Sequence, residues 1–150
     1  MDTTIQQRPD VDIEEDIRKF IRSYDPVKQA RGHFEFSCQN GNVKVWGNVR
    51  SMQAKRVLID NIYPDISGVV SLDASQLYDD ESLRLEIGQL IPDGVLIRMN
   101  YGSVVVTFPR GFGNAEEVLA KIRQVPGVRP QNVIADTLKF EKSVVPQKNS

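Results

Sequence analysis

The chain has 150 residues, of which 40% are hydrophobic and 26% are charged, and its formal net charge is −1. This composition is typical of a globular protein, and the near-neutral charge excludes a global electrostatic attraction to nucleic acid. No apolar run approaches the ~18 residues of a membrane span, and the N-terminus does not resemble a secretory signal, so we expect a cytoplasmic location, with the membrane periphery as an option.

The N-terminal part of the chain predicts a flexible start followed by an amphipathic helix. Residues 1–11 show no periodicity, and we expect them to be mobile. A helix then begins at Asp12, which has the spacing of a capping box with Glu15, and it stops before Pro26. The charged segment at 24–32 is predicted to be a loop. The helix carries one apolar stripe of four residues: Ile13, Ile17, Phe20 and Ile21.

A hairpin, a second helix and a third strand follow. The segment HFEFSCQNGNVKVWG alternates with period two on both sides of an Asn40–Gly41 turn. Gly47 lies inside the second strand, where glycine indicates a bulge or a close backbone approach. The helix SMQAKRVLIDNIY begins after Ser51, and VVSLDA at 69–74 reads as a short closing strand.

The same order of elements then recurs in the second half of the chain. DDESLRLEIGQLI carries apolar residues at the four spacings of the first helix: Leu83, Ile87, Leu90 and Ile91. A second hairpin turns at Tyr101–Gly102, a helix follows in NAEEVLAKIRQV, and a strand is predicted at 132–138. A helix in each copy ends in a Gly-Val step, at Gly68-Val69 and at Gly127-Val128.

The predicted fold is therefore α+β, with two tandem α-β-β-α-β repeats. The repeats span residues 12–78 and 79–140, and each packs two helices on one face of a three-stranded mixed sheet. Residues 141–150 are predicted to form a flexible tail.

These features resemble the BON domain family, small bacterial modules. The resemblance rests on Asp12, on Gly41, on the segment Val43-Lys44-Val45-Trp46-Gly47-Asn48-Val49 and on the Gly-Val steps of both copies. It covers about residues 12–140. It implies a phospholipid-binding or protein-interaction module, commonly of the bacterial envelope, and it implies no defined binding residues.

The sequence is poorly supplied for catalysis, so we expect a non-enzymatic protein without cofactor or metal. His33 is the only histidine, and Cys38 is in phase with buried positions. The single cysteine also excludes an intramolecular disulfide. In the glycine-rich segment at 110–117, Glu116 and Glu117 would repel an anion from the helix that follows.

The best candidate for an anion or lipid site lies at the start of the second helix. Ser51 is a plausible N-cap, and the first turn after it holds no carboxylate, so free amides and a positive helix end are expected there. Three cations flank this point: Arg50, Lys55 and Arg56. Solvated residues on an ordinary amphipathic helix are the alternative interpretation.

Three functions remain open from the sequence. The first is a binding module for membrane phospholipid or a protein partner, and the second is an oligomerising adaptor that pairs through sheet edges. Nucleic-acid binding is disfavoured by the neutral charge and by the lack of a Gly-x-x-Gly loop with basic flanks. Trp46 faces away from the helices of its own copy, and we expect it to be buried between the copies.

Overall fold

A computed structural model describes residues 7–137 of the chain, which divides into two compact units, Met1–Ser82 and Leu83–Ser150. The predicted repeat boundary, between residues 78 and 79, lies shortly before this division. The predicted tail at 141–150 lies outside the described residues. Within residues 7–137, no helix is both long enough and apolar enough to cross a membrane.

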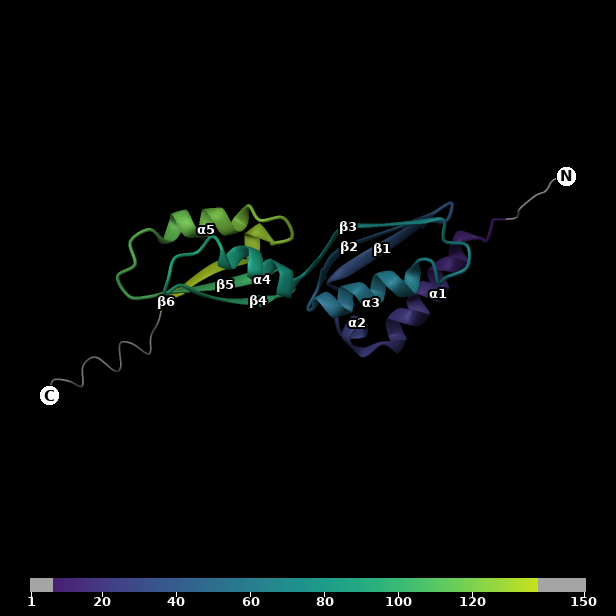
Figure 1. Cartoon of the computed structure of the whole chain (residues 1–150), viewed down its shortest axis with the longest axis horizontal. Coiled ribbons are helices and arrows are strands. Elements are labelled where there is room, and N and C mark those ends of the chain that lie inside the picture. The colour runs from purple at the N-terminus through teal and green to yellow at the C-terminus, as the bar shows by residue number, and fades with distance from the viewer. Residues whose placement is uncertain (1–6, 138–150) are drawn as a thin grey trace. The chain divides into compact units, whose positions relative to one another are not determined.

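Unit 1 consists of three helices on one face of a three-stranded sheet (Figure 1). Strand β2 is central: it pairs antiparallel with β1 and parallel with β3. The elements in chain order are α1 (Asp10–Ser23), α2 (Asp25–Gln29), β1 (Phe34–Gln39), β2 (Asn42–Val49), α3 (Met52–Ile62) and β3 (Ser71–Asp79).

Unit 2 repeats this topology. Strand β5 is central, antiparallel to β4 and parallel to β6. The elements are α4 (Asp80–Gly88), whose first turn precedes the division between the units, β4 (Leu96–Asn100), β5 (Ser103–Phe108), α5 (Ala115–Arg123), the 3₁₀ helix η1 (Pro130–Asn132) and β6 (Val133–Thr137). The predicted α+β fold with two three-stranded mixed sheets is confirmed.

Both hairpins close with the same turn. Asn40 and Gly41 have φ angles of +54° and +81°, and Tyr101 and Gly102 have +50° and +82°. Two successive residues with positive φ are the requirement of a type I′ turn, whose twist matches that of the strands it joins. The predicted turn positions are therefore confirmed in both units.

Gly47 serves the geometry of the sheet. Its φ is +123°, and a Cβ built on it would lie 2.5 Å from both the carbonyl oxygen of His33 and the Cα of Phe34. Phe34 is its direct partner on β1. The close backbone approach expected from the sequence is thus present, and a side chain at this position would clash with β1.

The first helix begins earlier than predicted. Helix α1 starts at Asp10 after Pro9, and its N-cap makes no side-chain hydrogen bond, so the predicted capping box of Asp12 and Glu15 is wrong. The Asp10 carboxylate instead accepts hydrogen bonds from the amides of Asn40 and Gly41 at 2.9 and 3.0 Å. Because the hairpin turn is far away in sequence, the helix periodicity gave no sign of this contact.

The predicted flexible start at 1–11 overlaps helix α1, which already includes Asp10 and Val11. Arg8 donates to Asp16 on α1 at 2.8 Å and to the Ser67 carbonyl at 3.0 Å. Residues 1–6 lie outside the described part of the chain.

Other predicted boundaries are also wrong, among them that of the strand predicted at 69–74, which is β3 (Ser71–Asp79). The segment predicted as a loop at 24–32 contains helix α2, where Pro26 lies in the first turn and Val27 is fully buried. Proline is favoured at this position because its missing N–H has no intrahelical partner there. Helix α4 ends at Gly88, so Leu90 lies beyond it and is 39% exposed.

Each unit has its own core between its helices and the inner face of its sheet. In unit 1 the core includes Ile13, Ile17, Val43, Val45 and Leu58, and in unit 2 it includes Ile87, Val104, Val106, Leu119 and Ile122. In unit 1, all helices lie on the inner face (Figure 1). Alternate strand residues that point away from that core form the opposite face.

Candidate functional site

The predicted anion-binding residues gather at the start of α3. Ser51 is the N-cap, and its Oγ accepts a hydrogen bond from the Ala54 amide at 3.0 Å, which confirms the predicted cap. Arg50 precedes the helix, and Lys55 and Arg56 follow in its second turn. We call these four residues, Arg50, Ser51, Lys55 and Arg56, the α3 basic surface.

A carboxylate from another element already occupies this helix terminus. The Met52 amide donates to Glu81 Oε1 at 2.9 Å. The expectation of free first-turn amides is therefore wrong for Met52. The cause is the parallel pairing of β2 with β3, which places Val49 opposite Asp79 and carries the following residues of α4 to the start of α3. The first turn of α3 itself holds no acid, as predicted.

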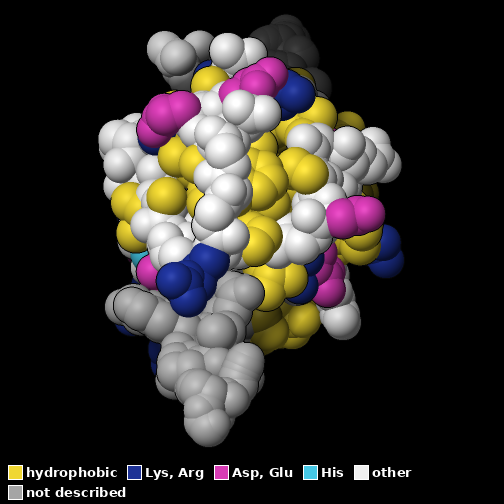
Figure 2. All heavy atoms as spheres, turned by 90° about the vertical axis from the view of Figure 1, so that its left-hand side faces the viewer, with side chains coloured by type: hydrophobic (Ala, Val, Ile, Leu, Met, Phe, Trp, Pro, Cys, Tyr) yellow, Lys and Arg dark blue, Asp and Glu magenta, His cyan; other side chains and the backbone are white. Residues whose placement is uncertain are grey.

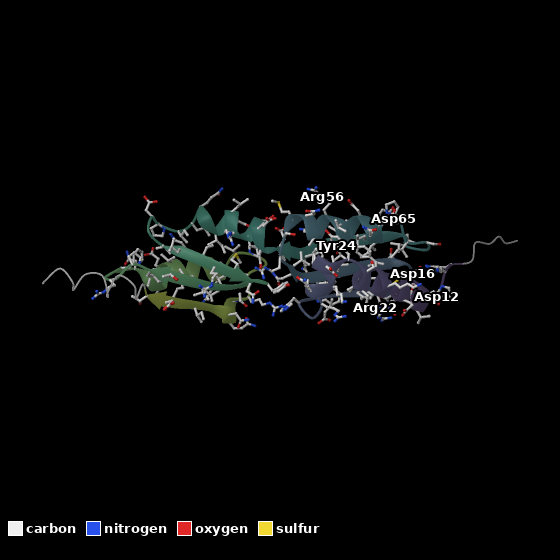
Figure 3. The ribbon with its side chains drawn as sticks, turned by 90° about the horizontal axis from the view of Figure 1, so that it is seen from below. Asp12, Asp16, Arg22, Tyr24, Arg56 and Asp65 are labelled. Atoms are coloured by element: carbon white, nitrogen blue, oxygen red, sulfur yellow. The ribbon has the colours of Figure 1, made fainter. Side chains whose placement is uncertain are left out.

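One of the three cations is also engaged. The Nε of Arg50 lies 3.5 Å from the Oδ2 of Asp80, whose side chain is 6% exposed. Lys55 and Arg56 line a depression of about 320 Å³ with Met52, Ile59, Asp79 and Ser82, and Figure 3 shows Arg56 at the edge of the helix layer. Anion binding by the α3 basic surface stays a prediction, and Lys55 and Arg56 are the cations best placed for it.

The chemistry of Cys38 does not suit nucleophilic catalysis. Its Sγ lies 3.4 Å from Asp10 Oδ1, and burial, together with this carboxylate, raises the pKa of the Cys38 thiol to about 11. A thiol with this pKa is protonated at neutral pH and is a weak nucleophile. Within residues 7–137, no group of three or more His, Cys, Asp or Glu side chains is arranged to hold a metal ion.

The outer sheet face of unit 1 is largely polar, and the register places two aromatic side chains on it, Trp46 and Tyr78. Trp46 is half-buried and pairs in register with Glu35 on β1, and the Nζ of Lys44 lies 5.8 Å from the Trp46 ring. This distance allows a cation–π interaction. Trp46 thus faces away from the helices of its unit, as predicted, whereas its burial between the copies stays a prediction.

The outer sheet face of unit 2 is more apolar. Strand register places Arg98, Val105 and Ile134 in one row across the sheet, and Leu96, Thr107 and Asp136 in the next. Leu96 and Ile134 are 59% and 58% exposed. We call these six residues the unit 2 sheet face. Hydrophobic side chains also reach the surface at the end of unit 2 shown in Figure 2.

A groove runs along the edge of the unit 1 sheet that β1 forms, where Phe34 makes an isolated bridge with Arg31. It has a volume of about 360 Å³ and lies between α1, the segment after α2, and β1. We call it the edge groove, and its lining includes Arg18, Ile21, Arg22, Arg31, Phe34 and Phe36. Sequence patterns do not predict this groove, because its three arginines come from separate positions of a predicted helix and a predicted loop.

No family model and no curated protein matches this sequence. Among solved structures, the chain is similar to the C-terminal domain of CdsD, described as the structural protein of the type III secretion system of Chlamydia trachomatis. The TM-score is 0.64, with 13% identity over 89% of this chain and 67% of that chain. A second structure of CdsD gives 0.61, with 17% identity over 92% and 68%. At these identities the likeness shows a shared fold.

Proposed function

We propose that this protein is a non-catalytic interaction module that associates with a second copy of itself through the unit 2 sheet face. The observation that carries the proposal is the exposure of Leu96 and Ile134 on a sheet face opposite the core. Exposed apolar clusters with a polar rim are characteristic of protein-interaction surfaces. The fold likeness to a structural protein of a secretion system supports an assembly role rather than a catalytic one.

The charges on this face favour a second copy as the partner. Arg98 lies in one row and Asp136 in the next, with apolar side chains in both rows. In a two-fold dimer the same patch meets itself, so a face with both charges can pair each one with its opposite. A face with charges of only one sign would repel its copy.

Sedimentation velocity over a wide range of protein concentrations tests this proposal. We expect the wild-type chain to form dimers as the concentration rises, and the variant Leu96→Lys with Ile134→Lys to remain monomeric. The matched control is Val11→Lys with Leu85→Lys, which changes two aliphatic side chains of similar exposure, 68% and 65%, outside this face. A monomeric wild type at all concentrations, or equal loss of dimers in the control, would refute it.

We also propose a second function, binding to anionic phospholipid through the α3 basic surface. The observation that favours it is the grouping of Lys55 and Arg56 with Met52, which is 44% exposed, on the same side of α3. A cation beside an exposed apolar side chain suits the interface of an anionic bilayer. The resemblance to the BON domain family supports the same function.

Co-sedimentation with vesicles of anionic or neutral phospholipid tests the second function. We expect binding to the anionic vesicles alone, and we expect Lys55→Glu with Arg56→Glu to abolish it without changing the circular dichroism spectrum. If the double variant binds as the wild type does, the α3 basic surface is not the contact. Equal binding to neutral vesicles would also argue against it.

A further inference from the structure

We propose that the edge groove of unit 1 binds an extended acidic peptide segment, which adds a strand to the outer edge of β1. This inference rests on the proposed function only in that the partner is a protein. It concerns a different unit and a different surface from the unit 2 sheet face. Three features of the groove suit such a peptide: its backbone edge, its arginines and its apolar floor.

The backbone of β1 offers hydrogen-bonding groups at this edge. The Asn48 amide donates to the His33 carbonyl at 2.9 Å, which makes this pair a hydrogen-bonded one in the antiparallel ladder. Because such pairs alternate, Glu35 and Ser37 also bond to β2, whereas the N–H and C=O of Phe36 point toward the outer edge. Phe34 on the same edge already forms a bridge with Arg31, so the edge offered to a peptide begins at Phe36. A peptide in extended conformation can pair with those groups by strand addition.

Helix α1 runs antiparallel to β1 and places two arginines along this edge. Asp10, at the start of α1, contacts Cys38 near the end of β1, and the Arg18 guanidinium lies 5.7 Å from the ring of Phe36. Arg22, one turn further on, lines the groove with Phe34. Residues four apart on a helix are separated by about 6 Å, and alternate residues on a strand by about 7 Å. Carboxylates at alternate peptide positions therefore match this spacing.

The arginines are available to a new partner because their present ion pairs are long and exposed. Arg18 lies 3.8 and 3.7 Å from Glu14 and Glu15, and Arg22 lies 3.4 Å from Glu15. A strong guanidinium–carboxylate hydrogen bond is about 2.8 Å long. Both arginine side chains are about half exposed, at 51% and 52%. Figure 3 shows Arg22 at the side of the helix layer away from Arg56.

The charge and the floor of the groove define which peptide fits. Three arginines, Arg18, Arg22 and Arg31, and one acid, Glu35, are among its lining residues. Glu35 alternates with Phe34 and Phe36, so it belongs to the outer sheet face. Peptide side chains that point into the groove would contact the arginines and the aromatic rings of Phe34 and Phe36. Peptide side chains that point the other way would lie beside Glu35. Acidic residues on the groove side should therefore alternate with uncharged ones.

A labelled synthetic peptide tests the inference directly. The probe is fluorescein-labelled Glu-Val-Glu-Thr-Glu-Val-Glu, and its binding to the full-length chain is measured by fluorescence anisotropy. One control peptide has the same composition with its glutamates consecutive, and another has lysine in place of glutamate. We expect the alternating acidic peptide to bind more tightly than both controls. No binding of this peptide, or equal binding of all three, would overturn the inference.

Protein variants show whether the peptide uses the edge groove. We expect Arg18→Gln with Arg22→Gln to weaken binding by about tenfold, as the loss of two exposed ion pairs predicts. Arg84→Gln with Lys121→Gln removes the same charge from exposed positions in α4 and α5 and should leave binding unchanged. Arg31→Gln, outside both helices α1 and α2, provides an independent second variant. Equal binding by the groove variants and the wild type would overturn the assignment.

Amide hydrogen exchange separates strand addition from simple charge attraction. We expect the peptide to slow exchange at the Phe36 amide by about tenfold or more, because that N–H becomes hydrogen-bonded. Unchanged exchange at Phe36 in the presence of bound peptide would contradict strand addition. If anionic vesicles or single-stranded RNA bind through Arg18 and Arg22 while the peptide does not, the inference is also wrong.

A failure of peptide binding in the edge groove can be distinguished from a failure of self-association through the unit 2 sheet face. Self-association is measured with the same wild-type protein and with Arg18→Gln/Arg22→Gln, which should dimerise normally. Dimers without peptide binding overturn only the edge-groove inference. Peptide binding by a chain that is monomeric throughout overturns only self-association through the unit 2 sheet face.

Discussion

At the scale of single residues, Asp10 links the start of α1 to the first hairpin turn. Hydrogen bonds from the Asn40 and Gly41 amides lower the pKa of the Asp10 carboxyl, with a smaller effect from Cys38. A depressed pKa in the folded state means that the ionised form stabilises the fold above the ordinary aspartate value and that this contribution is lost as the pH falls through the folded-state pKa.

We therefore expect Asp10→Asn to destabilise the protein at neutral pH and much less under acidic conditions. The wild type loses the charge of Asp10 when that carboxyl is protonated, so the two proteins should converge as the pH falls below 3.8, the ordinary pKa of the group. Urea unfolding at a series of pH values gives the difference. A difference that does not shrink in acid would show that the Asp10 charge is not the stabilising feature.

Gly47 provides the second residue-scale prediction. We expect Gly47→Ala to destabilise the protein by about 2 kcal/mol or more, because the new Cβ would meet β1 and the positive φ would be strained. Gly113→Ala is the matched control, since a Cβ there meets no atom within 4 Å. Denaturant midpoints compare the two. Equal midpoints for both variants would mean that the strands adjust at little cost.

At the scale of elements, Glu81 acts as a cap supplied by one helix to another. Its carboxylate accepts from the Met52 amide at the positive end of α3, where an acid is favourable. We expect Glu81→Gln to destabilise the fold by about 1 kcal/mol, within the range for loss of a helix cap. Glu86→Gln, also exposed on α4, is the control. Thermal unfolding that does not separate the two variants would refute the capping role.

The elements also show what the sequence could and could not predict. The type, order and turn positions of the main elements follow from local periodicity and from turn residues such as Gly41 and Gly102, and the structure confirms them. The partners of Asp10 and of the Met52 amide could not be predicted. Both contacts join residues about 30 positions apart, Asp10 with Asn40 and Met52 with Glu81, and such contacts exist only once the sheet has formed.

The difference between local and long-range contacts also explains which features of the candidate site could be predicted. Ser51 was correctly identified as an N-cap because capping is a local property. Whether the amides and cations around Ser51 are free depends on tertiary neighbours. Glu81 accepts a hydrogen bond from the Met52 amide, and Asp80 forms an ion pair with Arg50. The edge groove could not be found from sequence, because Arg18 and Phe36 meet only when α1 packs along β1.

At the scale of the whole molecule, the duplicated topology gives two sheets with different outer faces. In unit 1 this face holds polar side chains around Trp46, whereas in unit 2 it holds exposed Leu96 and Ile134. A purely structural duplication would need no such difference. The proposed self-association through the unit 2 sheet face rests on this difference.

Site-specific photo-crosslinking of the purified full-length chain tests this claim most directly. With benzoylphenylalanine in place of Arg98, which lies in the same row as Val105 and Ile134, irradiation at high protein concentration should yield covalent dimers. With the same group in place of Lys121, an exposed residue of α5, it should yield monomer. Covalent dimers from position 121 and none from position 98 would contradict the unit 2 sheet face as the interaction surface.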